Sequence, residues 1–285
     1  LIFNTAAVSA SSGYDNYGVV TTDADGDGFY DIRSVDNLQS MANDLSRNYE
    51  LTQDIDASET QNWDGGSGFD SIGNWDKKPY TGNFNGNGYV VSKLYIDRPN
   101  SDQMGLFGYL GSGSTLENVG VVDADVTGQT DTGALVGYLN ADSADTISNC
   151  YTSGSVSSSG SYIGGLIGSA QSNSSISNCF STVSVSGGNT VGGFIGLASV
   201  DISNCYSTGS VSGSSEVGGF AGNSGSNNYS DLYWDTESSG QSSSPIGTGL
   251  TTGEMTGDSA SNNMNFDFTN VWNSLTTDSS FSSDS

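Results

Sequence analysis

One motif occurs three times between Asp145 and Gly222: Ile147-Ser-Asn-Cys-Tyr151, Ile176-Ser-Asn-Cys-Phe180 and Ile202-Ser-Asn-Cys-Tyr206. Each copy closes with an apolar pair between glycines, and these closings are Gly165-Leu-Ile-Gly168, Gly193-Phe-Ile-Gly196 and Gly219-Phe-Ala-Gly222. The equivalent cysteines recur every 26 to 29 residues. Close self-similarity at such a period indicates a stacked-repeat architecture.

The repeats consist of Ser, Gly, Thr, Val and Asn and are poor in the residues that favour helices. About 26 residues suffice for three short strands and three corners, with successive coils about 4.8 Å apart. Weaker copies precede the motif at 116–137, where Val119 replaces the cysteine, and at 84–108. The sequence therefore predicts an all-β fold, a right-handed parallel β-helix of at least five coils.

Stacking explains why one residue type returns at each position. Three positions form predicted columns: an inward column of Ile147, Ile176 and Ile202, a second one of Val156, Val185 and Val211, and a corner ladder of Asn149, Asn178 and Asn204. The three cysteines form a further column, for which we expect free buried thiols. One disulfide between neighbouring coils is the alternative.

The repeat favours one elongated domain with four segments. These are an N-terminal strand and acidic loop at 1–33, an N-terminal cap at 34–80, the coils at 81–225, and a C-terminal cap and Ser/Asp-rich tail at 226–285. Ser34 is expected to cap a short helix at 35–46 that closes the first coil. A strand is expected at Leu1–Val8 and a short helix near 251–255.

The acidic stretch Asp23-Ala-Asp-Gly-Asp-Gly-Phe-Tyr-Asp31 resembles part of an EF-hand loop. Asp23, Asp25, Asp27 and Asp31 occupy positions 1, 3, 5 and 9, and a glycine stands at position 6. Ser34 stands at position 12, where a bidentate Glu is usual. We expect these four carboxylates to bind a structural Ca²⁺; an ordinary Asp/Gly turn is the alternative.

The composition excludes several classes of function. Six basic residues against 32 acidic ones give a net charge of −26, which argues against nucleic acid or an anionic membrane as partner. The chain has no histidine, which excludes Ser-His-Asp and Cys-His catalysis and His-ligated zinc. No run of 18 apolar residues occurs, so no membrane insertion is expected. The acidic surface fits an extracellular or cell-surface location.

The repeats resemble those of the GLUG-repeat β-helical surface proteins of bacteria and archaea. The resemblance rests on the closing glycine units and the Ile-Ser-Asn-Cys elements, and extends to Leu51–Asp56, Gly82–Gly88 and Gly249–Met255. The coil at 116–137 departs from the pattern, with Val119 for cysteine and Ala134 for a glycine. The resemblance implies a β-helix and a cell-surface setting, where relatives occur as adhesins, surface arrays and appendages of secreted peptidases.

A non-catalytic extracellular structural protein is the leading hypothesis: a self-associating subunit of a surface filament, sheath or layer, or an adhesin stalk. Its partners would be copies of itself or other cell-surface components. The alternative is a carbohydrate- or receptor-binding adhesin module, with glycans stacked on Trp63 and Trp75 or on a column of Tyr151, Phe180 and Tyr206. A polysaccharide-active enzyme is the third hypothesis, for which the candidate carboxylates are Asp123, Asp125, Asp142 and Asp145.

Overall fold

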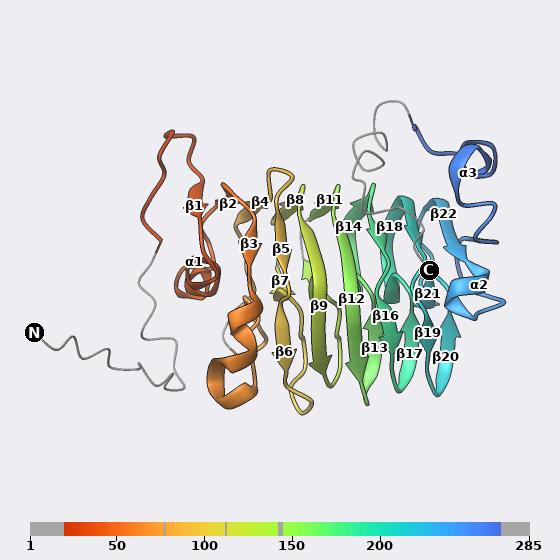
Figure 1. Cartoon of the computed structure of the whole chain (residues 1–285), viewed down its shortest axis with the longest axis horizontal. Helices are drawn as coiled ribbons and strands as arrows, with labels where there is room; N and C mark the ends of the chain where they lie inside the picture. The colour runs from red at the N-terminus through yellow and green to blue at the C-terminus, as the bar shows by residue number, and fades with distance from the viewer. Residues whose placement is uncertain (1–19, 77, 112, 142–144, 269–285) are drawn as a thin grey trace, which may run out of the picture.

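The computed structural model describes residues 20–76, 78–111, 113–141 and 145–268. The predicted strand at Leu1–Val8 and the candidate Asp142 lie outside these residues. The described chain forms a parallel β-solenoid whose coils lie side by side along one axis (Figure 1). The predicted all-β parallel β-helix of at least five coils is confirmed.

The strands before the cysteine-containing repeats are short, apart from β9. They are β1 (Tyr30–Ile32), β2 (Tyr49–Leu51), β3 (Ile55–Asp56), β4 (Asn83–Asn85), β5 (Val90–Ser92), β6 (Tyr95–Asp97), β7 (Phe107–Leu110), β8 (Thr115–Glu117) and β9 (Gly120–Gly128). The chain from Tyr49 to Asp56 forms two strands, β2 and β3. A turn separates them, and each pairs with a different strand of the next coil.

The remaining strands begin at the end of the coil at 116–137 and continue through the cysteine-containing repeats to the C-terminal cap. They are β10 (Val136–Ala141), β11 (Thr146–Ser148), β12 (Tyr151–Ser158), β13 (Ser161–Gly164), β14 (Ile167–Ser177), β15 (Phe180–Ser181), β16 (Ser184–Ser186), β17 (Asn189–Gly192), β18 (Ile195–Ser207), β19 (Val211–Ser212), β20 (Ser215–Gly218), β21 (Ala221–Ser224), β22 (Tyr229–Asp235) and β23 (Thr248–Leu250). β13, β17 and β20 form a separate parallel sheet.

The predicted apolar columns form the core. Ile147 pairs with Ile176, Ile176 pairs with Ile202, and all three are buried. Leu116 extends this column toward the N-terminus, which confirms the register of the coil at 116–137. Val156, Val185 and Val211 likewise form a second buried column. One apolar core therefore runs the length of the coils, because each coil covers the apolar face of the next.

The predicted asparagine ladder is present at the corner after each Ile-Ser pair. Asn149, Asn178 and Asn204 each donate from Nδ2 to the Oδ1 of the asparagine in the preceding coil, at 2.9, 3.3 and 3.3 Å respectively. Asn118 begins the column and donates to Asn85 at 3.1 Å. The four donors have φ between 52° and 57°, in the left-handed region that asparagine tolerates better than most residues. The side chain thus fixes both the corner and the stacking.

Glycine is required where the closing units stack. A Cβ on Gly165 would lie 2.3 Å from the carbonyl oxygen of Gly193, and a Cβ on Gly193 would lie 2.4 Å from that of Gly219. Both distances are shorter than any tolerated contact, so a larger residue would push the coils apart. This close approach explains why the first glycine of each closing unit recurs.

The cysteines confirm the expectation of free buried thiols. Cys150, Cys179 and Cys205 are unpaired and at most 1% exposed. Each Sγ donates to the carbonyl oxygen two residues earlier, at 3.1 Å. Burial raises the pKa of the Cys150 and Cys179 thiols well above the usual value, so these thiols act as small apolar side chains.

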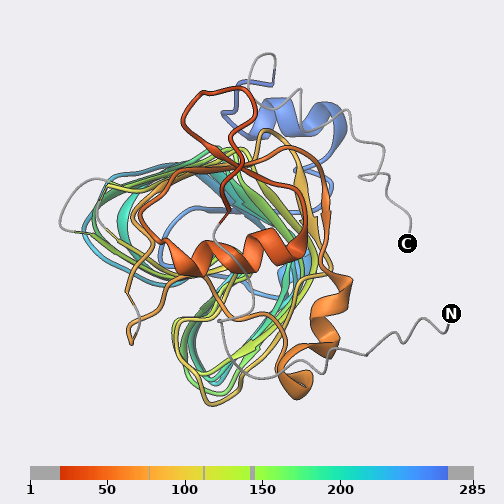
Figure 2. The ribbon, with the colours of Figure 1, turned by 90° about the vertical axis from the view of Figure 1, so that its left-hand side faces the viewer.

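The N-terminal end of the solenoid is covered by α1 (Val35–Ser40) and the 3₁₀ turn η2 (Met41–Asn43). Figure 2 looks along the coil axis and shows this segment crossing the end of the stack. Ser34 caps α1 as predicted, since its Oγ accepts from the Asn37 amide. The predicted helix 35–46 is too long, because η2 ends in a turn at Asp44. Leu38 and Met41 are fully buried and close the core.

A second 3₁₀ segment, η3 (Ser58–Gly66), lies in the excursion between β3 and β4. The C-terminal end is closed by α2 (Thr236–Ser239), β23 and the loop between them. Trp234 and Ile246 complete the core there and are 5% and 9% exposed. The predicted helix near 251–255 is wrong: Thr251 and Glu254 close a turn instead, and the helix is α3 (Gly257–Asn263).

Candidate functional site

The acidic loop precedes β1 and is shaped by its own carboxylates. Asp23 accepts the amides of Gly26 at 2.7 Å and Gly28 at 3.2 Å, while Asp27 accepts the amide of Phe29 at 2.8 Å. Both glycines have positive φ, of 80° and 92°. These bonds turn the chain back on itself, as a cation-binding loop requires.

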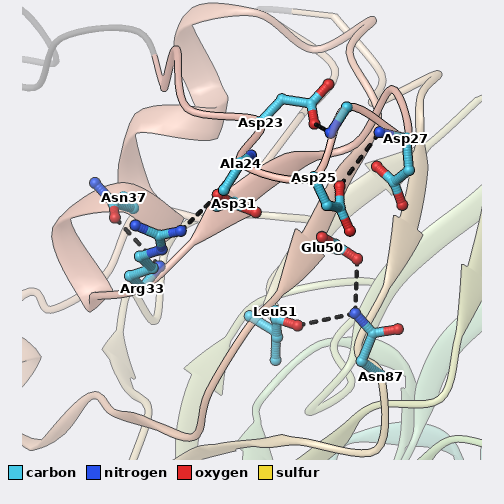
Figure 3. Close-up of polar contacts among 11 residues, drawn as sticks. Asp23, Ala24, Asp25, Asp27, Asp31, Arg33, Asn37, Glu50, Leu51 and Asn87 are labelled. Atoms are coloured by element: carbon cyan, nitrogen blue, oxygen red, sulfur yellow. Dashed lines mark hydrogen bonds and ion pairs between the residues drawn. The ribbon is translucent and has the colours of Figure 1, made fainter.

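The structure brings three of the four predicted ligands together. One oxygen from each of Asp23, Asp25 and Asp27 lies within 4.8 Å of the others (Figure 3). Asp31 lies apart from this group: its Oδ2 forms an ion pair with Arg33 at 2.8 Å and also accepts the amide of Ala24. Asp31 therefore holds the base of the loop, and the cluster of ligand oxygens consists of the other three.

Sequence reasoning missed a fourth carboxylate, that of Glu50. It lies on β2, where Glu50 pairs in register with Asp31, and it is only 7% exposed. Figure 3 shows its carboxylate beside that of Asp25, with Asn87 donating to it at 2.7 Å. Burial raises the pKa of Glu50, and the charges of Asp27 and Asp25 raise it further. A buried carboxylate facing like charges is favourable when a cation joins them.

The loop lacks a glutamate at position 12, and the structure places Glu50 of a neighbouring coil beside Asp25. No signal within the loop indicates Glu50, because it comes from the next coil. The strand register that places it beside Asp31 could have identified it, since Tyr30 and Tyr49 form one inward column and their successors must share the opposite face.

The aromatic residues that follow the cysteines point out of the core. Tyr151, Phe180 and Tyr206 stack face to face with ring centroids 5.0 Å apart and planes within 7°. This spacing matches the separation of neighbouring strands. The column is not an open platform: Phe266 contacts the Tyr206 ring, and Phe180 is only 2% exposed. A C-terminal segment with Met264 and Phe266 packs against this column.

The two tryptophans considered as sugar platforms differ. Trp63 packs against the core beside Phe69, with ring centroids 6.4 Å apart. Trp75 is 66% exposed and stacks on Tyr109 at 5.5 Å and 17°. Trp63 is half-buried, so Trp75 is the more exposed of the two.

Three of the candidate catalytic carboxylates, Asp123, Asp125 and Asp145, lie in the described part of the chain. Asp123 and Asp125 are exposed on β9, and Asp125 accepts a hydrogen bond from the Ser155 hydroxyl. Asp145 is buried and accepts the amides of Gly113 at 2.6 Å and Ser114 at 2.9 Å. Asp145 thus organises a corner of the solenoid.

A family model described as "The GLUG motif" matches residues 159–186, which contain one closing glycine unit and Cys179. The solenoid of this chain therefore contains a GLUG motif. The GLUG resemblance predicted from the repeats is confirmed, and the matched residues include all of β13, β14, β15 and β16.

Two relatives are similar to part of this chain. Halomucin of Haloquadratum walsbyi is 40% identical over 152 residues, which are 52% of this chain and 2% of that protein. A provisionally named Gly-rich membrane protein of Evansella cellulosilytica is 31% identical over 122 residues, 42% of this chain and 14% of that protein. The GLUG chain thus spans a small part of both relatives. Among its own described residues, no helix is long and apolar enough to cross a membrane.

A crystal structure from Bacteroides ovatus resembles the GLUG solenoid, with a TM-score of 0.58 and 29% identity. The match covers 72% of this chain and 67% of the other. That protein is provisionally named as an immunoglobulin A1 protease. Relatives of this GLUG chain therefore include proteins named for a membrane and for a protease.

Proposed function

We propose that this chain is a non-catalytic extracellular structural protein, a rigid β-helical stalk at the cell surface. The observation that carries the proposal is the single apolar core, which runs in register from the N-terminal cap to the C-terminal cap. A capped solenoid with a strongly acidic, polar surface is suited to hold other elements at a distance from the cell. The GLUG motif and the membrane-protein relative support the surface location.

The caps favour a stalk over a filament built by end-to-end stacking of coils. Leu38 and Met41 cover the first coil, while Trp234 covers the last. At the C-terminal end, the Ser244 hydroxyl accepts the amide of Ala221 at 3.0 Å, so a backbone donor of the last coil is already paired. Self-association into a filament, sheath or layer would then use the sides of the solenoid.

A structural calcium ion forms part of the proposal. Asp23, Asp25, Asp27 and Glu50 provide hard oxygen ligands of the kind that Ca²⁺ prefers. The ion would tie the acidic loop to β2 and so fasten the N-terminal cap to the first coil. Removal of Ca²⁺ is therefore expected to loosen this end of the solenoid first.

The proposed absence of catalysis rests on which nucleophiles and bases the chain contains and where they lie. The chain contains no histidine, and its thiols are buried in the core. Asp145 is held by two backbone amides, which leaves it a structural role.

Immunogold labelling of intact cells of the source organism tests the proposal. Antibodies against the purified chain are expected to label the outside of intact cells, at a distance from the envelope. Labelling that appears only after permeabilisation would contradict a surface stalk. Release of reducing ends from a panel of polysaccharides by the purified chain would contradict the non-catalytic assignment.

The alternative function, a carbohydrate-binding module, is favoured by one specific observation, the solvent-exposed ring of Trp75.

A further inference from the structure

Trp75 lies at the tip of a tight turn on the side of the solenoid. The turn is closed by two backbone hydrogen bonds between Asn74 and Lys78, at 3.1 and 3.0 Å. Trp75 and Tyr89 are the large hydrophobic side chains classed as exposed in the described residues, at 66% and 37%. An indole combines a large apolar face with an N–H donor, and tryptophan is enriched at binding interfaces for this reason.

The indole is held in one orientation. Its ring stacks on Tyr109 at 5.5 Å and leans against Tyr138 at 6.1 Å. The two tyrosines are register partners on β7 and β10, with ring centroids 5.3 Å apart. The backbone amide of Trp75 donates to Oε1 of Gln103 at 2.7 Å, and Gln103 is itself only 6% exposed. A preorganised ring loses little conformational entropy when a ligand stacks on it.

A groove of about 720 Å³ adjoins this aromatic cluster. Its volume lies within the range of small-molecule sites. The lining combines aromatic rings with polar groups from four successive coils, among them Asn74, Asp76, Asp102, Gln103, Asp131 and Gln171. Carboxylates and amides next to a flat apolar ring match the alternating hydroxyls and C–H faces of a sugar.

The charge of the lining selects among glycans. Four carboxylates line the groove: Asp70, Asp76, Asp102 and Asp131. Arg98 is the basic residue among the described lining residues, and it is already engaged by Asp64 at 3.0 Å and by the carbonyl oxygens of Gly68 and Phe69. Uronate, sulfate and phosphate groups would meet repulsion here, whereas the hydroxyls of a neutral sugar would donate to the carboxylates.

The backbone around the groove argues against an extended peptide. Peptides that add a strand need an unpaired sheet edge. Tyr109 and Tyr138 lie in strands that are paired in register with their neighbours, and β10 pairs with β7 on one side and β14 on the other. Recognition at this surface therefore relies on side chains.

We propose that Trp75, stacked on Tyr109 and Tyr138, and the adjoining acidic groove form a binding site for neutral glycans. The ring of Trp75 takes the C–H face of one sugar, while Asp102, Asp131 and the amides accept and donate hydrogen bonds to its hydroxyls. This site would give the stalk an adhesive side face.

Isothermal titration of the full chain with neutral hexasaccharides of glucose, mannose and N-acetylglucosamine tests the site. At least one is expected to bind, and Trp75→Ala is expected to weaken that binding by about tenfold or more, as for loss of an anchoring aromatic residue. Tyr89→Ala removes the other exposed ring, which does not line the groove, and is the matched control with an expected change below about twofold.

Circular dichroism melts verify that both variants fold, which is expected because both rings are exposed. Binding of Trp75→Ala as tight as that of the unaltered chain would overturn the site. So would the absence of binding by every neutral hexasaccharide, or tighter binding of an oligogalacturonate than of any neutral sugar.

Discussion

Asn178 tests whether the corner ladder stabilises the solenoid. Its Nδ2 donates to Asn149 and its Oδ1 accepts from Asn204, each at 3.3 Å, so one substitution removes two ladder bonds. Its backbone has φ of 55°, in the left-handed region. Asn178→Ala removes the bonds and keeps a Cβ in that conformation, whereas Asn178→Gly removes the bonds and relieves the backbone.

The magnitudes follow from these two effects. Two partly exposed hydrogen bonds contribute about 1–2 kcal/mol together. Alanine in the left-handed region adds about 1 kcal/mol, because it lacks the local hydrogen bonds that help asparagine there. We therefore expect Asn178→Ala to lower the free energy of unfolding by about 2–3 kcal/mol and Asn178→Gly by about 1–2 kcal/mol.

Urea unfolding followed by circular dichroism, at saturating Ca²⁺, measures both values. Asn173→Ala is the control, since Asn173 is exposed on β14 outside the ladder, and its change should stay within about 0.5 kcal/mol. The reasoning would be refuted if Asn178→Ala behaved like the control, or if glycine destabilised the chain more than alanine.

Three further predictions concern the metal, a buried acid and the thiols. EGTA should lower the melting temperature by about 5–10 °C, because it removes the bound Ca²⁺. Glu50→Gln should reduce this response, whereas Glu59→Gln, at an exposed position, should not. An unchanged melting temperature on adding EGTA would contradict the calcium site. Burial raises the pKa of Asp145 to about 6, above its unfolded value, so the folded state binds the extra proton. The contribution of Asp145 to the free energy of unfolding is fully present below about pH 4 and falls by up to about 3 kcal/mol as the pH rises through 6. Asp145→Asn should flatten the dependence of the free energy of unfolding on pH between these values. An unchanged pH dependence in this variant would show that Asp145 is not its cause. Iodoacetamide should modify none of the three cysteines in the folded chain at pH 8 and all three in urea, as counted by mass spectrometry; rapid native labelling would contradict the buried column.

The repeated positions were predictable because identical side chains at a fixed period must stack. Ile176 and Cys179 show this for the core, and Asn178 shows it for the corner. The same logic assigned Val119 to the cysteine column, and its full burial agrees. The coils, their register and their inward face could therefore be predicted from the periodicity of the sequence.

Features without a period could not be placed in the same way. Thr251 and Glu254 have the spacing of a helix cap, yet they close an isolated turn, and the helix begins only at Gly257. The long excursion that carries Trp75 is positioned by Gln103 of a later coil, which local sequence does not indicate.

The candidate sites also depend on neighbours from distant parts of the sequence. The acidic loop was recognisable from its own spacing, but Glu50 reaches it from another coil. Tyr151, Phe180 and Tyr206 were recognisable as a column, but their cover comes from Phe266, whose packing follows from the C-terminal segment. Long-range neighbours decide which exposed groups remain available.

Electron microscopy of the protein as isolated from its native surface tests the central claim most directly. The account predicts thin rods attached to envelope material and labelled along their length by antibodies against this chain. Compact particles confined to the soluble interior of the cell, with no labelled rod at the surface, would contradict it.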